Sequence, residues 1–388
     1  MPVVPASRVT ALSGEGAFEV LRAARHLEDA GRHVVHLEIG EPDWATPPHV
    51  VEAAVRALHD GNTRYVNPAG LPALRDAIAS SLAWRGVRAP SENIVVVPGA
   101  KPMLFYALLA VLEPGDEVLV PDPGFPIYPS VVRFAGAVPV PYSLDASGAV
   151  DSERLAALIG PRTRALVVNL PGNPTGGIAT AEDLRAIAEL ALRHDLVVIS
   201  DEVYGRIRYD RRADSIAALA GMPERTIIVD SFSKAYAMTG WRLGYLIAPR
   251  EFMRPLQTAH GNFFISTNEF VQWAALAALR EASEDAERFR RIFDERRHAM
   301  VAGLRRIGLG VVVPPTGAFY VLANAQRFGA DSKALAFDIL EHAHVGVTPG
   351  VDFGRRAEGF LRFSYANSLE RIEEAIERIG RYFAEREG

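Results

Sequence analysis

The feature of this 388-residue chain that most restricts its fold is a series of short apolar runs rich in valine, isoleucine and leucine. The runs are apolar at consecutive positions, which indicates strands that are buried on both faces. Such strands are typical of a mostly parallel sheet, and amphipathic segments such as residues 181–194 separate them as crossover helices would. We expect strands at residues 94–97, 117–120, 165–168, 196–199, 226–229 and 243–247. The sequence therefore predicts an α/β fold.

The pattern changes near residue 285, where the alternation of strands and helices ends. We then expect a long charged helix at 281–306, short strands at 311–313 and 318–322, and helices at 333–344 and from 369 onward. These elements predict a second, smaller α+β domain. A helix expected at 17–30 cannot form a core alone, so it should pack against that domain. We predict an N-terminal segment at 1–46 that packs with the small domain, a large domain at 47–285 and the small C-terminal domain at 286–388.

Composition and charge exclude several classes of function. The formal charge is only −5, so no basic surface field exists to attract nucleic acid. The absence of cysteine excludes disulfides, thiolate metal sites and cysteine nucleophiles. His342 and His344 have a spacing seen in metal sites, but without a nearby third ligand a solvated helix end explains them better. We find no signal sequence and no apolar stretch near the roughly 20 residues of a membrane span. We therefore expect a cytoplasmic protein with no metal, membrane or nucleic-acid partner.

Polar residues directly follow several of the expected strands, and ligands of open α/β sheets bind at the carboxyl ends of the strands. The first strand leads into residues 99–101, a small-residue turn that opens a helix and offers free N–H groups to an anion. The third leads into a loop rich in proline and glycine that fixes Asn173. The fourth is followed by Asp201 and Tyr204, an acid and a phenol.

The segment after the fifth strand contains the most informative residue, Lys234. A lysine among the strands of a buried sheet loses hydration, which lowers its pKa and suits it to form a Schiff base. Ser231, Ser233 and Arg242 add two hydroxyls and a guanidinium that can bind a dianion beside it. Together with the acid and the amide that follow the neighbouring strands, these groups describe a site for pyridoxal 5'-phosphate.

These motifs resemble those of the class I/II aminotransferases of the aspartate aminotransferase superfamily, especially the bacterial Iγ-like branch with thermophilic aspartate aminotransferases. The similar segments span nearly the whole chain and read IGEPDW at 39–44, YVNPAGLPALR at 65–75, NPTGG, SDEVYG, SFSKAYAMTGWRLGY, GAFYVL and LRFSYAN. The resemblance implies fold type I, with a mostly parallel seven-stranded sheet in the large domain and a smaller α+β domain. It also implies a homodimer that moves an amino group between an L-amino acid and a 2-oxo acid by ping-pong chemistry.

The resemblance implies a role for each matching residue. Lys234 matches the Schiff-base lysine that also shuttles the substrate proton, and Asp201 matches the acid that pairs with the ring nitrogen of the cofactor. Asn173 and Tyr204 match two hydrogen-bond donors to the phenolate oxygen of the cofactor. Phe125 takes the place of an aromatic ring that stacks on the cofactor, where many members have tryptophan.

The resemblance also implies two groups of binding residues. The cofactor phosphate is bound by Ser231, Ser233, Arg242, the backbone of Gly99, Ala100 and Lys101, and Tyr65 from the neighbouring subunit. The substrate α-carboxylate is bound by the side chain of Arg362 and the backbone of Gly40, with Asn173 beside it. Because Tyr65 reaches across, the resemblance implies an obligate dimer.

Two other functions stay open beside an aminotransferase. One is a pyridoxal phosphate-dependent lyase on the same fold, such as a carbon–sulfur β-lyase or a cyclopropane-forming synthase. The other is a non-catalytic sensor of the cofactor or of amino acids. The sensor is disfavoured because few residues precede the IGEPDW segment and the catalytic set is complete.

The substrate is the least determined property. In the resembled aspartate-specific enzymes, a lysine matching Lys101 and small hydroxyl residues near the N-terminus bind the distal carboxylate. Here the N-terminal segment at 14–17 reads GEGA, and Glu15 repels a second carboxylate unless it turns away or pairs with Lys101. Aspartate and glutamate therefore stay open, and neutral or aromatic donors gain weight. Phe18 is either a lid over the substrate or a core residue.

Overall fold

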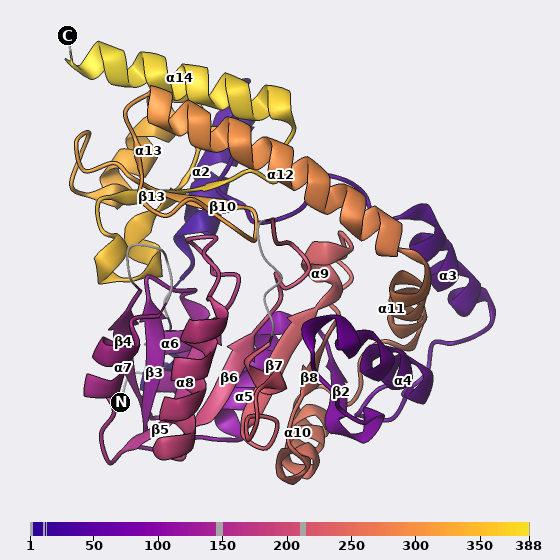
Figure 1. The fold of residues 1–388 in the computed structure, drawn as a ribbon. Coiled ribbons are helices and arrows are strands. Elements are labelled where there is room, and N and C mark those ends of the chain that lie inside the picture. Colours follow the sequence, from indigo (N-terminus) through magenta and orange to yellow (C-terminus); the bar gives the residue numbers. More distant parts are fainter. Residues whose placement is uncertain (1–2, 11, 13, 145–149, 210–214, 388) are drawn as a thin grey trace.

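A seven-stranded sheet forms the centre of the computed structural model, which describes residues 3–10, 12, 14–144, 150–209 and 215–387 (Figure 1). The order of the strands is β2-β8-β7-β6-β5-β3-β4. Their bounds are β2 (Ile94–Val97), β3 (Glu117–Asp122), β4 (Val138–Ser143), β5 (Thr163–Asn169), β6 (Val197–Asp201), β7 (Thr226–Ser231) and β8 (Gly244–Ile247). Only β8 runs against its neighbours among these strands. The predicted α/β fold with a mostly parallel seven-stranded sheet is confirmed.

The strand that the sequence did not indicate, β4, lies at the edge of this sheet and pairs with β3 alone. It contains Pro139 and Pro141, and its first four residues are exposed or half-buried. Proline is tolerated at an edge because one side of the strand needs no hydrogen-bond donor. The run consequently lacks the continuous apolar character of the other six strands of this sheet.

Helices cover both faces of the sheet, as strands apolar on both sides require. They include α4 (Pro72–Ser81), α5 (Ala100–Leu109), α6 (Ile127–Phe134), α8 (Ala181–Arg193), α10 (Arg250–Phe263) and α11 (Glu269–Glu281). Successive residues of β7 belong to opposite faces: Ile227 and Val229 pack with α5 and α6, whereas Ile228 packs with α4 and α11. The start of α8 is fixed by a capping box, in which Thr180 Oγ1 accepts from the N–H of Asp183 and the Asp183 carboxylate accepts from the N–H of Thr180.

A second, four-stranded sheet lies beyond the carboxyl ends of the parallel strands (Figure 1). It is built from β9 (Gly310–Val311), β10 (Tyr320–Asn324), β12 (Thr348–Pro349) and β13 (Phe360–Ser364), with helices α12 (Ser283–Arg306), α13 (Ser332–Ala343) and α14 (Leu369–Glu387) around it. The charged α12 runs from α11 to α14 (Figure 1). No helix in the described ranges combines the length and the apolar character that a membrane crossing requires.

The N-terminal part of the chain packs with this second sheet and its helices. In α2 (Gly16–Asp29), Val20 and Ala24 share an apolar cluster with Leu340 of α13. The next segment, β1 (Val35–His36), pairs in parallel with β11 (Val345–Gly346). Residues 38–46 then connect this part of the chain to the large sheet and its helices. The division of the chain after residues 46 and 285 stays a prediction.

Candidate active site

The amine of Lys234 lies at the carboxyl edge of the large sheet, where α9 (Phe232–Ala235) follows β7. Its Nζ donates a hydrogen bond of 2.6 Å to the backbone oxygen of Gly40. Burial lowers the pKa of this amine to about 8; Arg362 and Arg242 lower it further, and Glu41 acts in the opposite direction. The amine is therefore much closer to being a free base near neutral pH than an exposed lysine is.

Asp201, the last residue of β6, carries a carboxylate that is 3 % exposed and forms no ion pair with any residue the structure describes. The hydroxyl of Tyr128 donates to its Oδ2 at 2.7 Å, and the N–H of Val203 donates to its Oδ1 at 3.3 Å. Burial raises the pKa of this carboxyl to about 6 in spite of these bonds. Burying an ionised acid without a cation costs folding free energy. A ligand that brings a positively charged N–H would offset this cost, so the site suits such a ligand.

Arg362 and Asn173 meet where β13 faces the loop after β5. Arg362 is 5 % exposed, and its Nη1 donates to Oδ1 of Asn173 at 3.1 Å. Its Nη2 donates to the backbone oxygen of Glu38 at 2.5 Å and to Oγ1 of Thr348 at 3.0 Å. Its Nε is buried with no hydrogen-bond partner among the described residues. The guanidinium is thus fixed by oxygen atoms of the chain while one donor is left over for a ligand.

The turn at Gly99 forms one wall of an anion site with Arg242. Gly99 has φ +96°, and a side chain added there would overlap Nη2 of Arg242. Because α5 begins at Ala100, its first N–H groups are free to bind an anion next to that guanidinium. Ser231 Oγ and Ser233 Oγ lie 2.8 Å apart, so their hydroxyls are already joined in one cluster. Both serines are buried.

Tyr204 lies between the two sheets. Its hydroxyl is 2.8 Å from the hydroxyl of Tyr320 on β10, and burial raises the pKa of the Tyr204 phenol well above its usual range. Gly40 packs so closely on Tyr320 that a side chain at position 40 would overlap the phenol. Gly40 must therefore be a glycine for the chain to pass this point.

Lys101 and Glu15 form an ion pair at the start of α2. The Nζ of Lys101 lies 5.7 Å from the ring centre of Phe125 and 5.9 Å from that of Phe18. Phe18 is 54 % exposed, so it is not a core residue, and its ring lies beside the ion pair instead. The two charges and two rings close one side of the region around Lys234.

Tyr65 is the one predicted site residue that the described chain does not bring to the others. Its side chain is 80 % exposed, and its hydroxyl has no hydrogen-bond partner among the described residues. A residue predicted to act in a neighbouring subunit has this property, but the single chain does not test that role.

Comparison with known proteins identifies the family. The family model for class I and II aminotransferases matches residues 32–379. The chain belongs to this family. It is 42 % identical to the aspartate/prephenate aminotransferase of Thermus thermophilus over 96 % of this chain and 97 % of that one. The predicted membership, fold type I and aminotransferase class are confirmed, and the family implies pyridoxal phosphate as cofactor.

Solved structures agree with this result. The aspartate aminotransferase from Thermus thermophilus with maleate superposes with a TM-score of 0.94 at 39 % identity, covering 98 % of this chain and all of that one. The aromatic aminotransferase from Pyrococcus horikoshii gives 0.89 at 40 % identity, over 94 % of this chain and 99 % of that one. This aminotransferase is therefore similar throughout its length to enzymes named for acidic and for aromatic substrates.

Three residues around the site of this aminotransferase were not expected there from the sequence: Tyr128, Tyr320 and Arg85. Tyr128 binds Asp201 from α6, and Tyr320 binds Tyr204 from the second sheet. Arg85 is buried behind the strand ends and binds two carboxylates. In the sequence, the only indication of a role for Arg85 is its place next to Trp84 at the end of an ordinary helical segment.

We predict that Asp201→Asn stabilises the cofactor-free protein at pH 8. The wild-type acid ionises above about pH 6 in the folded state but near 3.8 when unfolded, so its charge opposes folding above pH 6. The gain in unfolding free energy should be about 1–3 kcal/mol at pH 8 and should fade between pH 6 and 4, where the wild-type carboxyl is neutral as well. Urea unfolding at several pH values measures this. The exposed Asp76 is the matched control, and Asp76→Asn should change little; equal stabilisation by both variants would contradict the assignment.

Proposed function

We propose that this aminotransferase uses pyridoxal 5'-phosphate to move an amino group between an L-amino acid and a 2-oxo acid in two half-reactions. One observation carries the proposal: a buried amine of lowered pKa, Lys234 on the helix after β7, and a buried carboxylate without a cation among the described residues, Asp201 at the end of β6, lie at the same edge of the sheet, where these two strands are neighbours. The cofactor has an aldehyde for such an amine and a ring nitrogen for such an acid. The relatives named above are aminotransferases rather than lyases or sensors, which supports the transferase over those alternatives.

The residues fit the cofactor at its phosphate end as well. Gly99 leaves room beside the guanidinium of Arg242 that any side chain would fill. The free N–H groups at the start of α5 and the hydroxyls of Ser231 and Ser233 supply neutral donors. Arg242 supplies the charge that a dianion needs. We propose that these groups bind the phosphate and that Phe125 packs on the ring.

When bound, the cofactor supplies a carbonyl carbon that condenses with amines and a ring that withdraws electrons from the substrate α-carbon. As a free amine, Lys234 would take a proton at Nζ from the substrate α-carbon and later give it up again. Its lowered pKa suits both directions of transfer. The buried carboxylate of Asp201 would pair with the ring nitrogen and keep a proton on it. Tyr204 and Asn173 donate hydrogen bonds to the ring oxygen.

We propose that Arg362 binds the α-carboxylate of the substrate. Its two Nη atoms are oriented by Asn173, Glu38 and Thr348, whereas the buried Nε has no partner among the described residues. A carboxylate that replaces the present oxygen acceptors forms a bidentate pair. We propose that Gly40, whose carbonyl oxygen accepts from Lys234, contacts the same carboxylate through its backbone N–H.

The substrate side chain, we propose, meets the ion pair of Lys101 and Glu15 between the rings of Phe18 and Phe125. Because Glu15 already provides a carboxylate to Lys101, the ion pair has no net charge. A neutral or aromatic substrate side chain can pack against the two rings without breaking the ion pair of Lys101 and Glu15. A dicarboxylate must displace Glu15 to reach Lys101, which lowers but does not abolish its use. The aspartate/prephenate aminotransferase and the aromatic aminotransferase named above support this dual specificity.

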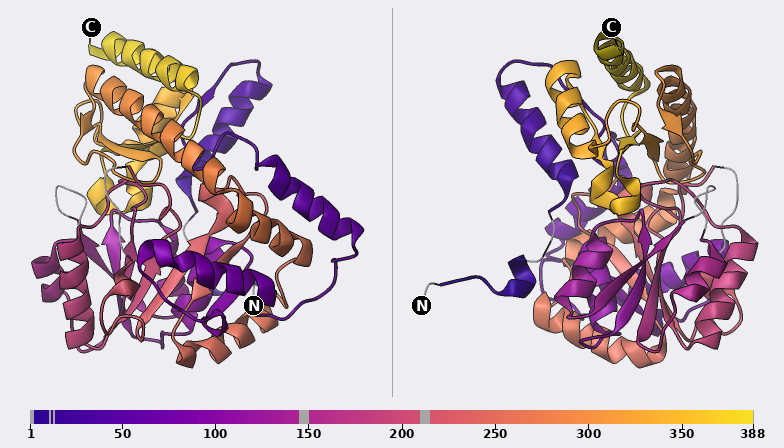
Figure 2. Two further views of the ribbon diagram at one scale, coloured as in Figure 1. Left: turned by 45° about the vertical axis from the view of Figure 1, so that its right-hand side comes forward. Right: turned by 90° about the vertical axis from the view of Figure 1, so that its left-hand side faces the viewer.

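We further propose a homodimer in which Tyr65 completes the neighbouring site. Tyr65 is exposed at 80 %, and Phe263, Phe264 and Ile265 form an exposed apolar stretch at the end of α10. Residues 3–10, which include α1 (Ser7–Thr10), project from the body (Figure 2). Exposed apolar patches of this kind mark interaction surfaces.

Lys234→Ala should abolish turnover while the protein stays folded, since both the amine and the proton carrier are lost. The sequence contains only three lysines, Lys101, Lys234 and Lys333, which makes the chemical test sharp. Borohydride reduction of the wild type with bound cofactor, followed by peptide mapping, should label Lys234. Lys333→Arg, which changes an exposed lysine paired with Glu19, should be labelled like the wild type. A label on Lys101 or Lys333 refutes the assignment.

Glu15→Gln should shift the preference towards dicarboxylic donors, because it frees Lys101. We expect the ratio of kcat/KM for aspartate to that for phenylalanine to rise about tenfold, which corresponds to roughly 1.4 kcal/mol. Lys101→Met should lower the same ratio. Glu19→Gln is the matched control on α2, since Glu19 pairs with Lys333 instead. If the ratio is the same in all four proteins, the ion pair does not set specificity.

Tyr65→Phe should weaken cofactor binding about ten- to a hundredfold, the value of a charge-assisted hydrogen bond of about 1.5–3 kcal/mol. Turnover at saturating cofactor should change much less, because the phosphate is remote from the reacting carbon. Mixing these subunits with Lys234→Ala subunits gives the sharper measurement. In the mixed dimer, a site can combine Lys234 with Tyr65 only if the two residues come from different subunits. Heterodimers that show no recovery of tight cofactor binding would exclude the exchange of Tyr65.

A further inference from the structure

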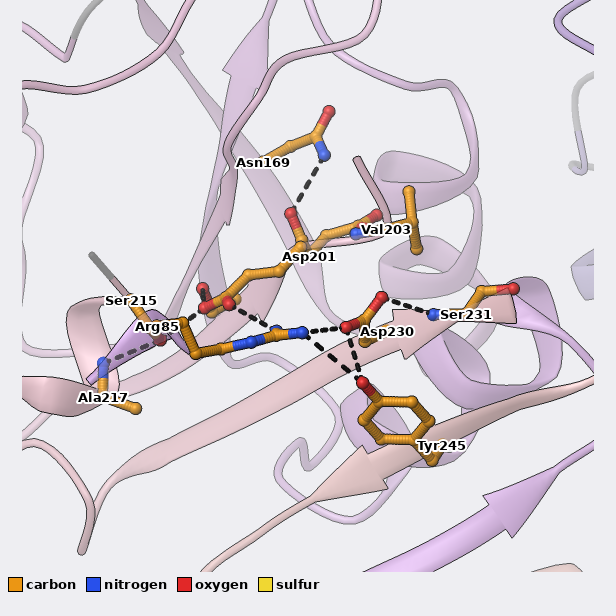
Figure 3. A network of polar contacts seen from close by, with 11 residues as sticks. Arg85, Asn169, Asp201, Val203, Ser215, Ala217, Asp230, Ser231 and Tyr245 are labelled. Carbon is orange, nitrogen blue, oxygen red and sulfur yellow. Dashed lines mark hydrogen bonds and ion pairs between the residues drawn. The ribbon is translucent and has the colours of Figure 1, made fainter. Parts of the chain in front are cut away.

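Arg85 lies buried behind the candidate active site, between the ends of β6 and β7 (Figure 3). It is the last residue of a short helix, η1 (Leu82–Arg85), and its side chain is 1 % exposed. Its Nη1 donates to Oε2 of Glu202 at 2.8 Å, and its Nη2 forms an ion pair with Oδ2 of Asp230. A fully buried arginine is rare and requires paired acids.

Both acids are chain neighbours of residues in the site. Glu202 directly follows Asp201, and Asp230 directly precedes Ser231. Asp230 also accepts a hydrogen bond of 2.7 Å through Oδ1 from the backbone N–H of Ser231. One guanidinium therefore ties together the strand end that carries the buried carboxylate and the strand end that opens the phosphate site (Figure 3).

The remaining oxygen atoms of these acids are also occupied. Oε1 of Glu202 accepts from the hydroxyls of Ser200 at 2.8 Å and Ser215 at 2.5 Å. Oδ2 of Asp230 accepts from the hydroxyl of Tyr245 on β8 at 2.7 Å. The carboxylates thus have fixed directions, and the network connects five segments of the chain: η1, the end of β6, Ser215, the end of β7 and β8. Such a network favours one arrangement of its members, although Nε of Arg85 itself is buried without a hydrogen-bond partner among the described residues.

We propose that Arg85 is a positioning residue of the active site, which fixes the carboxylate of Asp201 and the N–H of Ser231 by clamping their neighbours Glu202 and Asp230. The proposal rests on the proposed function for the roles of Asp201 and Ser231. It adds a residue that touches neither substrate nor cofactor.

Charge adds a second consequence of the same geometry. The groups that act on the Asp201 carboxyl are Tyr128 from α6 and the acids Glu202 and Asp230 behind it, and both acids raise its pKa. Arg85 is the cation that offsets them. Without Arg85 the surroundings of the site become more negative, so a proton on the cofactor bound at Lys234 is held to a higher pH.

The test compares Arg85→Gln with Arg225→Gln, a matched arginine at the opposite ends of the same strands. Arg225 precedes β7 and donates to the backbone oxygens of Ala191 and Leu196, just before β6. Both variants should lower the unfolding midpoint of the cofactor-free protein. Only Arg85→Gln should raise the dissociation constant for pyridoxal phosphate at least tenfold and move the pH midpoint of the visible absorption of the bound cofactor upward.

The double variant Arg85→Gln with Glu202→Gln separates positioning from charge. It restores the net charge of the network without restoring the clamp. The absorption midpoint should return towards the wild-type value, whereas the dissociation constant should stay at least fivefold raised. Arg85→Lys, which keeps the cation but reaches one acid at a time, should recover part of the cofactor affinity.

An Arg85→Gln variant within twofold of the wild type in cofactor affinity, and with an unchanged absorption midpoint, refutes the proposal and leaves Arg85 a purely structural residue. If Arg85→Gln does not fold, Arg85→Lys and Glu202→Gln are measured in the same way, and unchanged affinity and midpoint in both have the same meaning. Wild-type protein that takes up no pyridoxal phosphate refutes the proposed function instead, so the two failures are distinguishable.

Discussion

Parallel pairing in register brings the ends of β5, β6 and β7 to one level of the sheet. Asn169 lies opposite Asp201, and Asp201 lies opposite Val229, two residues before Ser231. The side chain of Asn169 uses this alignment, since its Nδ2 donates to the backbone oxygen of Asp201 and its Oδ1 accepts from the N–H of Asn173. Every group of the site that follows a strand end depends on this register, because a shift by one residue would reverse the side chains.

The sheet edge gathers several cations and keeps its buried acid apart from them until a ligand binds. The cations Lys234, Arg242 and Arg362 are close enough to influence one another, whereas Asp201 lies buried without a cation among the described residues. Both arrangements oppose folding, and buried polar partners such as Tyr128 offset only part of that cost. An anionic ligand with a protonated ring relieves both at once, so the same groups that weaken the empty protein favour its loading.

Local sequence was enough to predict the parts of the site that follow buried strands. Asp201 and Lys234 follow continuous apolar runs within two and five residues, so their position at the sheet edge follows from the pattern. The edge strand β4 was missed because prolines interrupt it, and Tyr320 and Arg85 because they reach the site from distant segments. No local pattern records such long-range contacts. The pairing of Glu15 with Lys101 was one of two alternatives in the sequence, and the structure selects it. The catalytic roles of the site residues stay predictions.

Two carbonyl groups two residues apart restrain two of the cations of the site. The backbone oxygen of Glu38 accepts from Arg362, and that of Gly40 accepts from Lys234. These backbone oxygens occupy hydrogen-bond positions that ligand oxygens would take. They belong to the segment that joins the N-terminal part of the chain to the large sheet. We expect a ligand that binds either cation to displace the carbonyl oxygen that now accepts from it, which frees part of the same segment. Binding at one of these two cations should then affect binding at the other, and such a coupling is equal in both directions.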